Sequence, residues 1–402
     1  MRIHHTSTTT LLLVIFSLNG CGDDENLNTN PVDTTVADSM PDDTAAPDTM
    51  PADTAVPDTT DVAEPDAQGE CGPSNLVACQ YPSRGATVVK REGIATLEPE
   101  TGRSLPLVAR IPALAGPLPV VIWSHGGGFP GGGEQESVQW GETFAAHGYV
   151  VIHIGHAPLG SGGPQKLCEL SSVPTAECVP SDDEDSNGLI AIGKAYDIKA
   201  VLDDLPRLSQ ISVDNGGPSL DLDRVAVAGW SGGSRGPMVL MGAEVRPTPG
   251  APLYTNPDAR PKAAIFMSPA GAGFGGWFDT GTENSWDAMR GPTFGATGTN
   301  DVKPNKLDLT GAVRREYFVA QPADDERWLL YSNLEVGVGG HGTYNLGDLD
   351  ASDARLKRLS QAIASTARAF LDASLKDDAA ARAWLDSNKA RVLAGNAEWL
   401  HR

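Results

Sequence analysis

The segment at 229–233 reads Gly-Trp-Ser-Gly-Gly and follows the G-x-S-x-G pattern, which presents a serine hydroxyl at a sharp turn. An apolar run of strand length precedes it directly, and helix-compatible sequence follows from 234 to 242. Such a turn needs small residues two positions before and after the serine, because side chains there would collide with neighbouring backbone. The pattern predicts that Ser231 is a nucleophile, and a Gly/Ser turn without chemistry is the alternative.

A nucleophilic serine needs a base and an acid that orients the base. In strand–turn–helix enzymes of this type the acid and then the histidine follow the serine along the chain. Two histidines follow Ser231, namely His341 in a Gly-rich segment after an apolar run and His401 near the C-terminal end. We expect His341 to be the base. Asp301 directly follows another apolar run and is the expected acid, and Asp308 is the alternative.

A Ser-His-Gly-Gly-Gly segment begins at Ser124, directly after an apolar run. Consecutive glycines allow backbone N–H groups to face a ligand. We expect the amide of Gly127 to form an oxyanion hole together with the amide of Gly232, with Gly126 or Gly128 as alternatives to Gly127. A phosphate-binding loop is the competing interpretation, but the lysine that a P-loop requires does not follow the glycines.

The segments between these residues alternate between strand-like and helix-like patterns, which is typical of an α/β domain. Unbroken apolar runs indicate strands buried on both faces, as in a parallel sheet. We therefore expect a mostly parallel central sheet with helices on both faces. A leading antiparallel pair is expected at 87–96 and 104–111, further strands at 119–123, 149–154, 225–228, 263–267, 292–295 and 328–331, and helices at 190–208 and 353–375.

The chain has 402 residues, and its charge is uneven. Residues 21–70 contain 14 acidic residues and no lysine or arginine, and a decapeptide at 40–49 is repeated at 50–59 with small changes. Regular prolines and unopposed like charges prevent a packed core, so we expect a disordered tether at 21–70 and a folded domain at 71–402. No basic face is apparent, which argues against nucleic-acid binding.

Residues 1–20 predict a signal peptide, because the apolar run at 11–18 is too short to span a bilayer. The run ends in Leu-Asn-Gly-Cys at 18–21, which resembles a bacterial lipobox and implies lipidation of Cys21. We therefore expect an exported protein that is anchored to a membrane of the bacterial cell envelope, and ordinary secretion is the alternative.

The remaining cysteines form two close pairs, Cys71 with Cys79 and Cys168 with Cys178. An exported chain meets an oxidising compartment, so we expect two local disulfides. Zinc binding is the competing use, but no histidine lies at a ligand-like spacing from either pair.

Asp183, Asp185 and Asn187, followed by glycine, copy the first part of an EF-hand-type calcium loop. The twelfth position is Lys194, where a bidentate glutamate would be required. An acidic helix N-terminus is therefore the favoured interpretation, and we predict no metal or cofactor.

Taken together, these segments resemble the α/β-hydrolase superfamily, and within it the branch of dienelactone hydrolases, platelet-activating-factor acetylhydrolases and polyester-hydrolysing cutinases. The resemblance implies an α/β-hydrolase fold and hydrolysis of a small-molecule or polymeric carboxylic ester through an acyl-enzyme. A serine peptidase of the same fold and a non-catalytic surface binding protein are the alternatives. The resemblance covers about residues 80–390 and rests on His125-Gly-Gly-Gly, 222–233, Gly298-Thr-Asn-Asp301, Gly340-His341 and the helix-like segment 369–376.

Aromatic residues near the expected site are candidates for a substrate pocket. Trp230 precedes the serine, and Trp277 and Phe278 follow the strand expected at 263–267, together with Phe274 and Trp286. Packing in the core is the alternative role for these rings.

Overall fold

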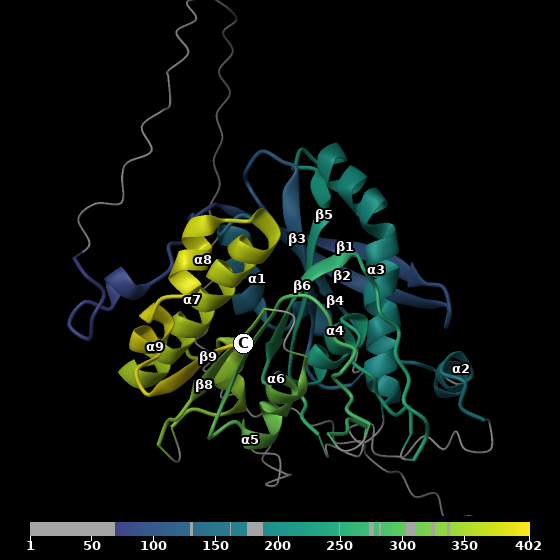
Figure 1. The fold of residues 1–402 in the computed structure, drawn as a ribbon. Helices are drawn as coiled ribbons and strands as arrows, with labels where there is room; N and C mark the ends of the chain where they lie inside the picture. The colour runs from purple at the N-terminus through teal and green to yellow at the C-terminus, as the bar shows by residue number, and fades with distance from the viewer. Residues whose placement is uncertain are drawn as a thin grey trace, which may run out of the picture. The chain divides into compact units, whose positions relative to one another are not determined.

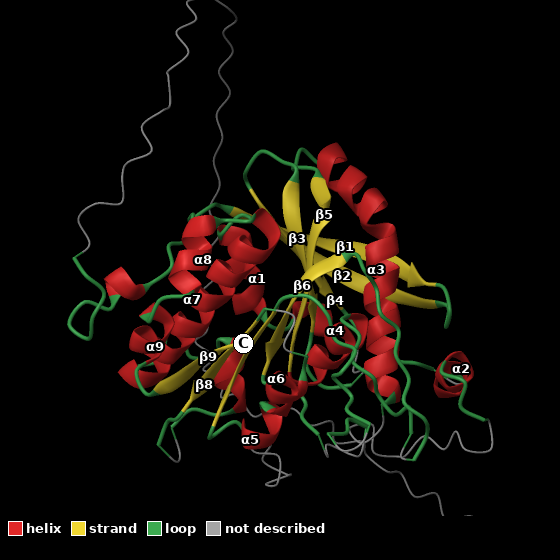
Figure 2. Ribbon diagram, in the orientation of Figure 1, coloured by secondary structure: helices red, strands yellow, loops and turns green. Residues whose placement is uncertain are grey.

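A nine-stranded sheet forms the centre of the described chain (Figure 2). The computed structural model describes residues 69–402 except 129–131, 161, 175–187, 249, 273–276, 281–282, 303–310, 323–325 and 336–337. These residues belong to one compact unit, Pro65–Arg402. In this part of the chain, no helix is both long and apolar enough to cross a bilayer.

The strand order in the sheet is β1-β2-β4-β3-β5-β6-β7-β8-β9. Strands β4, β3, β5, β6, β7 and β8 pair in parallel, whereas β1, β2 and β9 pair in antiparallel fashion at the two sides. The expected α/β class with a mostly parallel sheet is therefore confirmed. The strands are β1 (Val88–Glu98), β2 (Arg103–Pro112), β3 (Leu118–Ser124), β4 (Val150–Ile154), β5 (Leu220–Trp230), β6 (Pro261–Met267), β7 (Thr293–Gly298), β8 (Arg327–Ser332) and β9 (Ala397–His401).

Helices pack on both faces of the sheet, and each face has its own apolar core (Figure 1). One core joins the sheet to α2, α3, α4 and α6, and the other joins it to α1, α7, α8 and α9. The helices are α1 (Val138–Ala146), α2 (Gly163–Leu170), α3 (Leu189–Asp214), α4 (Arg235–Leu240), α5 (Gly311–Arg314), α6 (Glu316–Ala320), α7 (Ala354–Lys376), α8 (Ala379–Leu385) and α9 (Lys389–Ala394), with 3-10 turns η1 (Val77–Cys79), η2 (Gly133–Gln135), η4 (Ser231–Ser234) and η5 (His341–Asn345).

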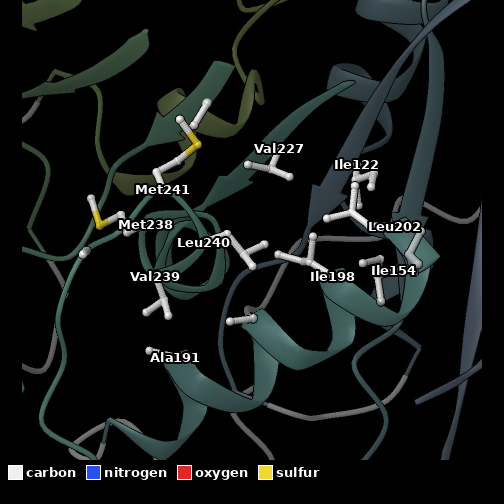
Figure 3. Close-up of a cluster of buried hydrophobic side chains, with 14 of the residues drawn as sticks. Ile122, Ile154, Ala191, Ile198, Leu202, Val227, Met238, Val239, Leu240 and Met241 are labelled. Atoms are coloured by element: carbon white, nitrogen blue, oxygen red, sulfur yellow. The ribbon is translucent and has the colours of Figure 1, made fainter. Parts of the chain in front are cut away.

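The core under α3 and α4 is made of aliphatic side chains from both helices and from the sheet (Figure 3). Ile198 and Leu202 of α3 are buried with Leu240 of α4 and with Ile122 and Val227 of the central strands. Burial of one such side chain contributes roughly 1.5–3 kcal/mol. This packing fixes α4, and with it the turn that precedes α4.

On the opposite face, one buried carboxylate joins α7 to distant segments. Asp372 accepts hydrogen bonds from the hydroxyls of Tyr81 at 2.9 Å and Tyr149 at 2.6 Å, and from the ammonium of Lys376 at 2.7 Å. The Nε2 atom of His147 lies 2.8 Å from the same carboxylate. A buried charge needs such partners, so this cluster ties α7 to the start of β4 and to the segment before β1.

The cysteine predictions have different outcomes. The Cys71–Cys79 disulfide is confirmed, with a Cα–Cα distance of 4.7 Å. Cys168 is buried in α2 and disulfide-bonded, whereas Cys178, its expected partner, lies outside the described residues. Cys21, the expected signal peptide at 1–20 and nearly all of the expected tether at 21–70 also lie outside them.

Four buried histidines predict acid sensitivity of the fold. Burial lowers the pKa of His125, His147 and His156 below 6.5 and that of His153 to about 3. Below pH 6.5 the unfolded chain therefore binds up to four more protons on these histidines than the folded chain does. Burial raises the pKa of Asp197 to about 7, so the folded chain binds one proton there that the unfolded chain does not, and the net difference is up to three protons. The free energy of unfolding should fall below pH 6.5 by up to about 4 kcal/mol per pH unit. Urea unfolding at pH 7.5 and 5.5 measures this, and equal midpoints would contradict it.

Candidate active site

The residues singled out for chemistry follow the carboxyl ends of neighbouring strands. Ser231 comes directly after β5, Asp301 shortly after β7, and His341 after β8. The glycine segment that contains Gly127 follows β3, the neighbour of β5. Parallel strands direct their carboxyl ends to the same edge of a sheet, so these residues converge although they are far apart in sequence.

Ser231 lies at a tight turn between β5 and α4. Its φ angle is 54°, a left-handed conformation that is uncommon for a residue with a side chain. A Cβ atom on Gly229 would lie 2.2 Å from the carbonyl oxygen of Gly233, and one on Gly233 would lie 2.1 Å from that of Ser124. Both glycines are therefore required by backbone contact, as the sequence pattern predicts.

The structure brings Ser231, His341 and Asp301 into one hydrogen-bonded chain. The Oγ atom of Ser231 lies 2.7 Å from Nε2 of His341, and Nδ1 of His341 lies 2.7 Å from Oδ1 of Asp301. Asp301 is fully buried, whereas the side chain of His341 is 20% exposed. The imidazole can therefore take a proton from the serine while the carboxylate orients it.

Three further side chains hold the carboxylate of Asp301. Thr297 donates to Oδ2 at 2.7 Å, Ser268 donates to Oδ1 at 2.8 Å, and Nε of Arg314 lies 3.2 Å from Oδ1. The Oγ atom of Ser268 also lies 2.7 Å from Nδ1 of His341. These contacts on both oxygens of the carboxylate fix the rotamer of Asp301.

Ser268 contacts both the acid and the base, and the sequence patterns did not predict it. Ser268 directly follows β6, the strand between β5 and β7, and its φ angle is 49°. A broader criterion than the one that selected the carboxylate Asp301, namely any polar residue directly after an apolar run, would also have selected Ser268.

The backbone around His341 is held by two contacts. The indole Nε1 of Trp230 donates to the carbonyl oxygen of His341 at 3.2 Å, and the two rings lie 4.8 Å apart between centroids. On the other side, the amide of Gly340 donates to Oγ1 of Thr343 at 3.1 Å, and Thr343 donates to Asp348 at 2.6 Å. Trp230 is therefore a neighbour of the candidate base.

The glycine segment after β3 lies against the serine turn. A Cβ atom on Gly232 would lie 2.4 Å from the carbonyl oxygen and 3.0 Å from the amide nitrogen of Gly127, whose φ angle is 66°. A Cβ atom on Gly126 would lie 3.7 Å from the Cβ atom of Ser231. The amides of Gly126, Gly127 and Gly232 are thus close to the serine, where an oxyanion would form.

The other aromatic candidates occupy the core on the face of α3 and α4. Trp277 and Phe278 are almost fully buried, and Trp286 stacks on Phe278 with 5.4 Å between centroids. The guanidinium of Arg235 lies 3.8 Å above the ring of Trp277. These positions agree with the packing role rather than with an open pocket. Phe274 lies outside the described residues.

No group of histidine, cysteine and carboxylate side chains suited to a metal ion occurs among the residues described. The calcium-loop candidates Asp183, Asp185 and Asn187 fall outside them, as does the alternative acid Asp308. Lys194, at the twelfth position of that loop, is buried in α3 and donates to the carbonyl oxygen of His125 at 2.8 Å.

No protein-family model matches the chain, and no curated protein has a significantly similar sequence.

The backbone contact at the turn leads to a stability prediction. Gly233→Ala should lower the free energy of unfolding by about 1–3 kcal/mol, because the added methyl group overlaps with the Ser124 carbonyl oxygen. Gly72→Ala is the matched control, since a Cβ atom there meets nothing within 4 Å. Urea unfolding of both variants measures the difference, and equal stabilities would show that the turn can relax.

Proposed function

We propose that this protein is a serine hydrolase of the α/β-hydrolase type that cleaves carboxylic esters through an acyl-enzyme. The observation that carries the proposal is the continuous hydrogen-bonded chain from Ser231 through His341 to Asp301, at the carboxyl edge of a mostly parallel sheet. A serine, an imidazole and a carboxylate in this order form the arrangement of serine hydrolases on several unrelated folds.

In the proposed first step, Nε2 of His341 accepts the proton of the Ser231 hydroxyl as the serine oxygen attacks the ester carbonyl. Nδ1–H of His341 donates to Asp301, which stabilises the imidazolium that forms. The imidazolium then protonates the leaving alkoxide, and an acyl group remains on Ser231. Water attacks this acyl-enzyme with His341 again as base, and the acid product and free Ser231 result.

The amides of Gly127 and Gly232 are the proposed oxyanion donors, and the amide of Gly126 is a further candidate donor. Their closeness to Ser231 supports this role, because the carbonyl oxygen of a bound ester develops negative charge beside the nucleophile. One such donor typically contributes about 3–4 kcal/mol to stabilisation of the transition state.

We also propose that the protein is exported and lipid-anchored through Cys21. The apolar segment at 11–18 and the lipobox-like sequence support this location. The Cys71–Cys79 disulfide fits it, because such bonds persist in oxidising compartments.

The nucleophile is tested by Ser231→Ala. This variant should lose hydrolysis of short-chain p-nitrophenyl esters and should not be labelled by a fluorophosphonate, because both reactions need the serine oxygen. Ser360→Ala removes a buried hydroxyl on α7 and is the control that should keep wild-type rates. Turnover by Ser231→Ala close to the wild-type rate would refute the proposal, and an unreactive wild type would favour a binding protein.

The acid is tested by Asp301→Asn. We expect kcat for the same esters to fall by about 10⁴-fold, because an amide in place of the carboxylate favours the wrong imidazole tautomer. An unchanged rate would remove Asp301 from the mechanism.

The wild type should be assayed in parallel on aminoacyl anilides, and faster cleavage of anilides than of esters would identify a peptidase.

A further inference from the structure

A second buried hydrogen-bonded chain begins at Ser124, directly before the glycine segment. The Oγ atom of Ser124 lies 2.7 Å from Nε2 of His156, and Nδ1 of His156 lies 2.7 Å from Oδ2 of Asp197. Arg103 bonds to both oxygens of Asp197. We call these four residues the buried tetrad. All four are less than a tenth exposed, so Ser124 cannot meet a substrate despite the Ser–His–Asp order.

The proton positions in the tetrad follow from its environment. Burial lowers the pKa of His156 well below 6.5, so its ring is neutral and carries one proton. Burial raises the pKa of Asp197 to about 7 against the opposing effect of Arg103, so above pH 7 a carboxylate faces Nδ1. Nδ1–H then donates to Asp197, and Nε2 accepts from the Ser124 hydroxyl. The end of β3 is thereby joined to α3 and β2.

His125 extends this network into the glycine segment. Its ring centroid lies 4.8 Å from that of His156, and the amide of His156 donates to its Nε2 at 3.3 Å. Burial lowers the pKa of His125, so the ring is neutral, and its Nδ1–H donates to the carbonyl oxygen of Gly126 at 2.7 Å. That oxygen belongs to the peptide unit whose N–H is the amide of Gly127.

Lys194 holds the preceding peptide unit in the same way. Its ammonium donates to the carbonyl oxygen of His125 at 2.8 Å, and the N–H of that unit is the amide of Gly126. Lys194 belongs to α3 and packs closely against α4, because a Cβ atom on Gly236 of α4 would lie 2.9 Å from its Cβ atom. The residue therefore joins the glycine segment to the helix that follows the serine turn.

These contacts determine where the two N–H groups point. In a planar trans peptide the C=O and N–H bonds point in opposite directions, so a donor that fixes the carbonyl oxygen also fixes the N–H. A donor to the carbonyl oxygen additionally polarises the peptide and strengthens hydrogen bonds from its N–H. The ammonium of Lys194 has the larger effect, because it is charged.

We propose that Lys194, His125 and the buried tetrad are positioning residues that aim the amides of Gly126 and Gly127 at the oxyanion of the reaction. This inference rests on the serine hydrolase function proposed above. None of the positioning residues needs to contact the substrate. Their loss should raise the energy of the transition state and leave binding of the ester almost unchanged.

The test uses Lys194→Met and His125→Leu in the full chain, with His125→Asn as the conservative variant, because its amide nitrogen can replace Nδ1 as a donor. We expect Lys194→Met and His125→Leu to lower kcat for a p-nitrophenyl ester roughly 10- to 100-fold with KM within about twofold. The affinity for a trifluoromethyl ketone, whose serine adduct carries an oxyanion, should fall by the same factor as kcat. His125→Asn should recover most of the loss.

Lys199→Met is the matched control, because Lys199 lies on the same helix and donates at 2.8 Å to Asn256 instead of to the glycine segment. It should keep wild-type kcat and ketone affinity. If Lys194→Met and His125→Leu kept the kcat and ketone affinity of the wild type, the positioning role would be overturned. It would also be overturned if His125→Asn recovered no more activity than His125→Leu. A wild type that hydrolyses no ester and binds no ketone would instead contradict the proposed function.

Discussion

The contact between the backbone of the serine turn and the end of β3 is the constraint on which the site depends. Gly233 lies so close to the carbonyl oxygens of Ser124 and His125 that a side chain would overlap with both, and a side chain on Gly232 would overlap with the carbonyl oxygen of Gly127. No side chain therefore separates the serine turn from the glycine segment. The distance between the two is set by van der Waals contact of main-chain atoms, which cannot adjust by a change of rotamer.

Two imidazole–carboxylate pairs occupy the same edge of the sheet, and solvent access distinguishes them. His341 with Asp301 is partly open, whereas His156 with Asp197 is fully buried. In both pairs an arginine contacts the carboxylate, and a serine hydroxyl lies at Nε2 of the imidazole. A buried carboxylate without such partners would lower the free energy of unfolding, so both Asp301 and Asp197 have an arginine and an imidazole as partners. The open pair suits proton transfer, and the closed pair suits support of the backbone.

Much of this arrangement follows from sequence patterns, because unbroken apolar runs predict the parallel strands and glycine spacing predicts the turn. The order of serine, acid and histidine along the chain also places them at the carboxyl ends of β5, β7 and β8. Arg314 was not predicted, because its role exists only once α5 lies beside β7. Ser268 was not predicted, because only a carboxylate was expected to orient the histidine from a strand end. Helix α1 and strand β9 were missed for a different reason. Their local patterns are weak, with a glycine inside α1, and burial of rings such as Trp140 stabilises them in the tertiary structure.

The contact between Trp230 and His341 gives the molecule an internal optical reporter. The indole of Trp230 lies 4.8 Å from the imidazole between centroids, at an interplanar angle of 37°, and donates to the backbone carbonyl of His341. We expect the emission of Trp230 to change when the imidazole of His341 moves, because the two rings are in contact. Comparison of the native chain with one that lacks this indole would isolate the signal from the other tryptophans and report on the position of the imidazole without any substrate.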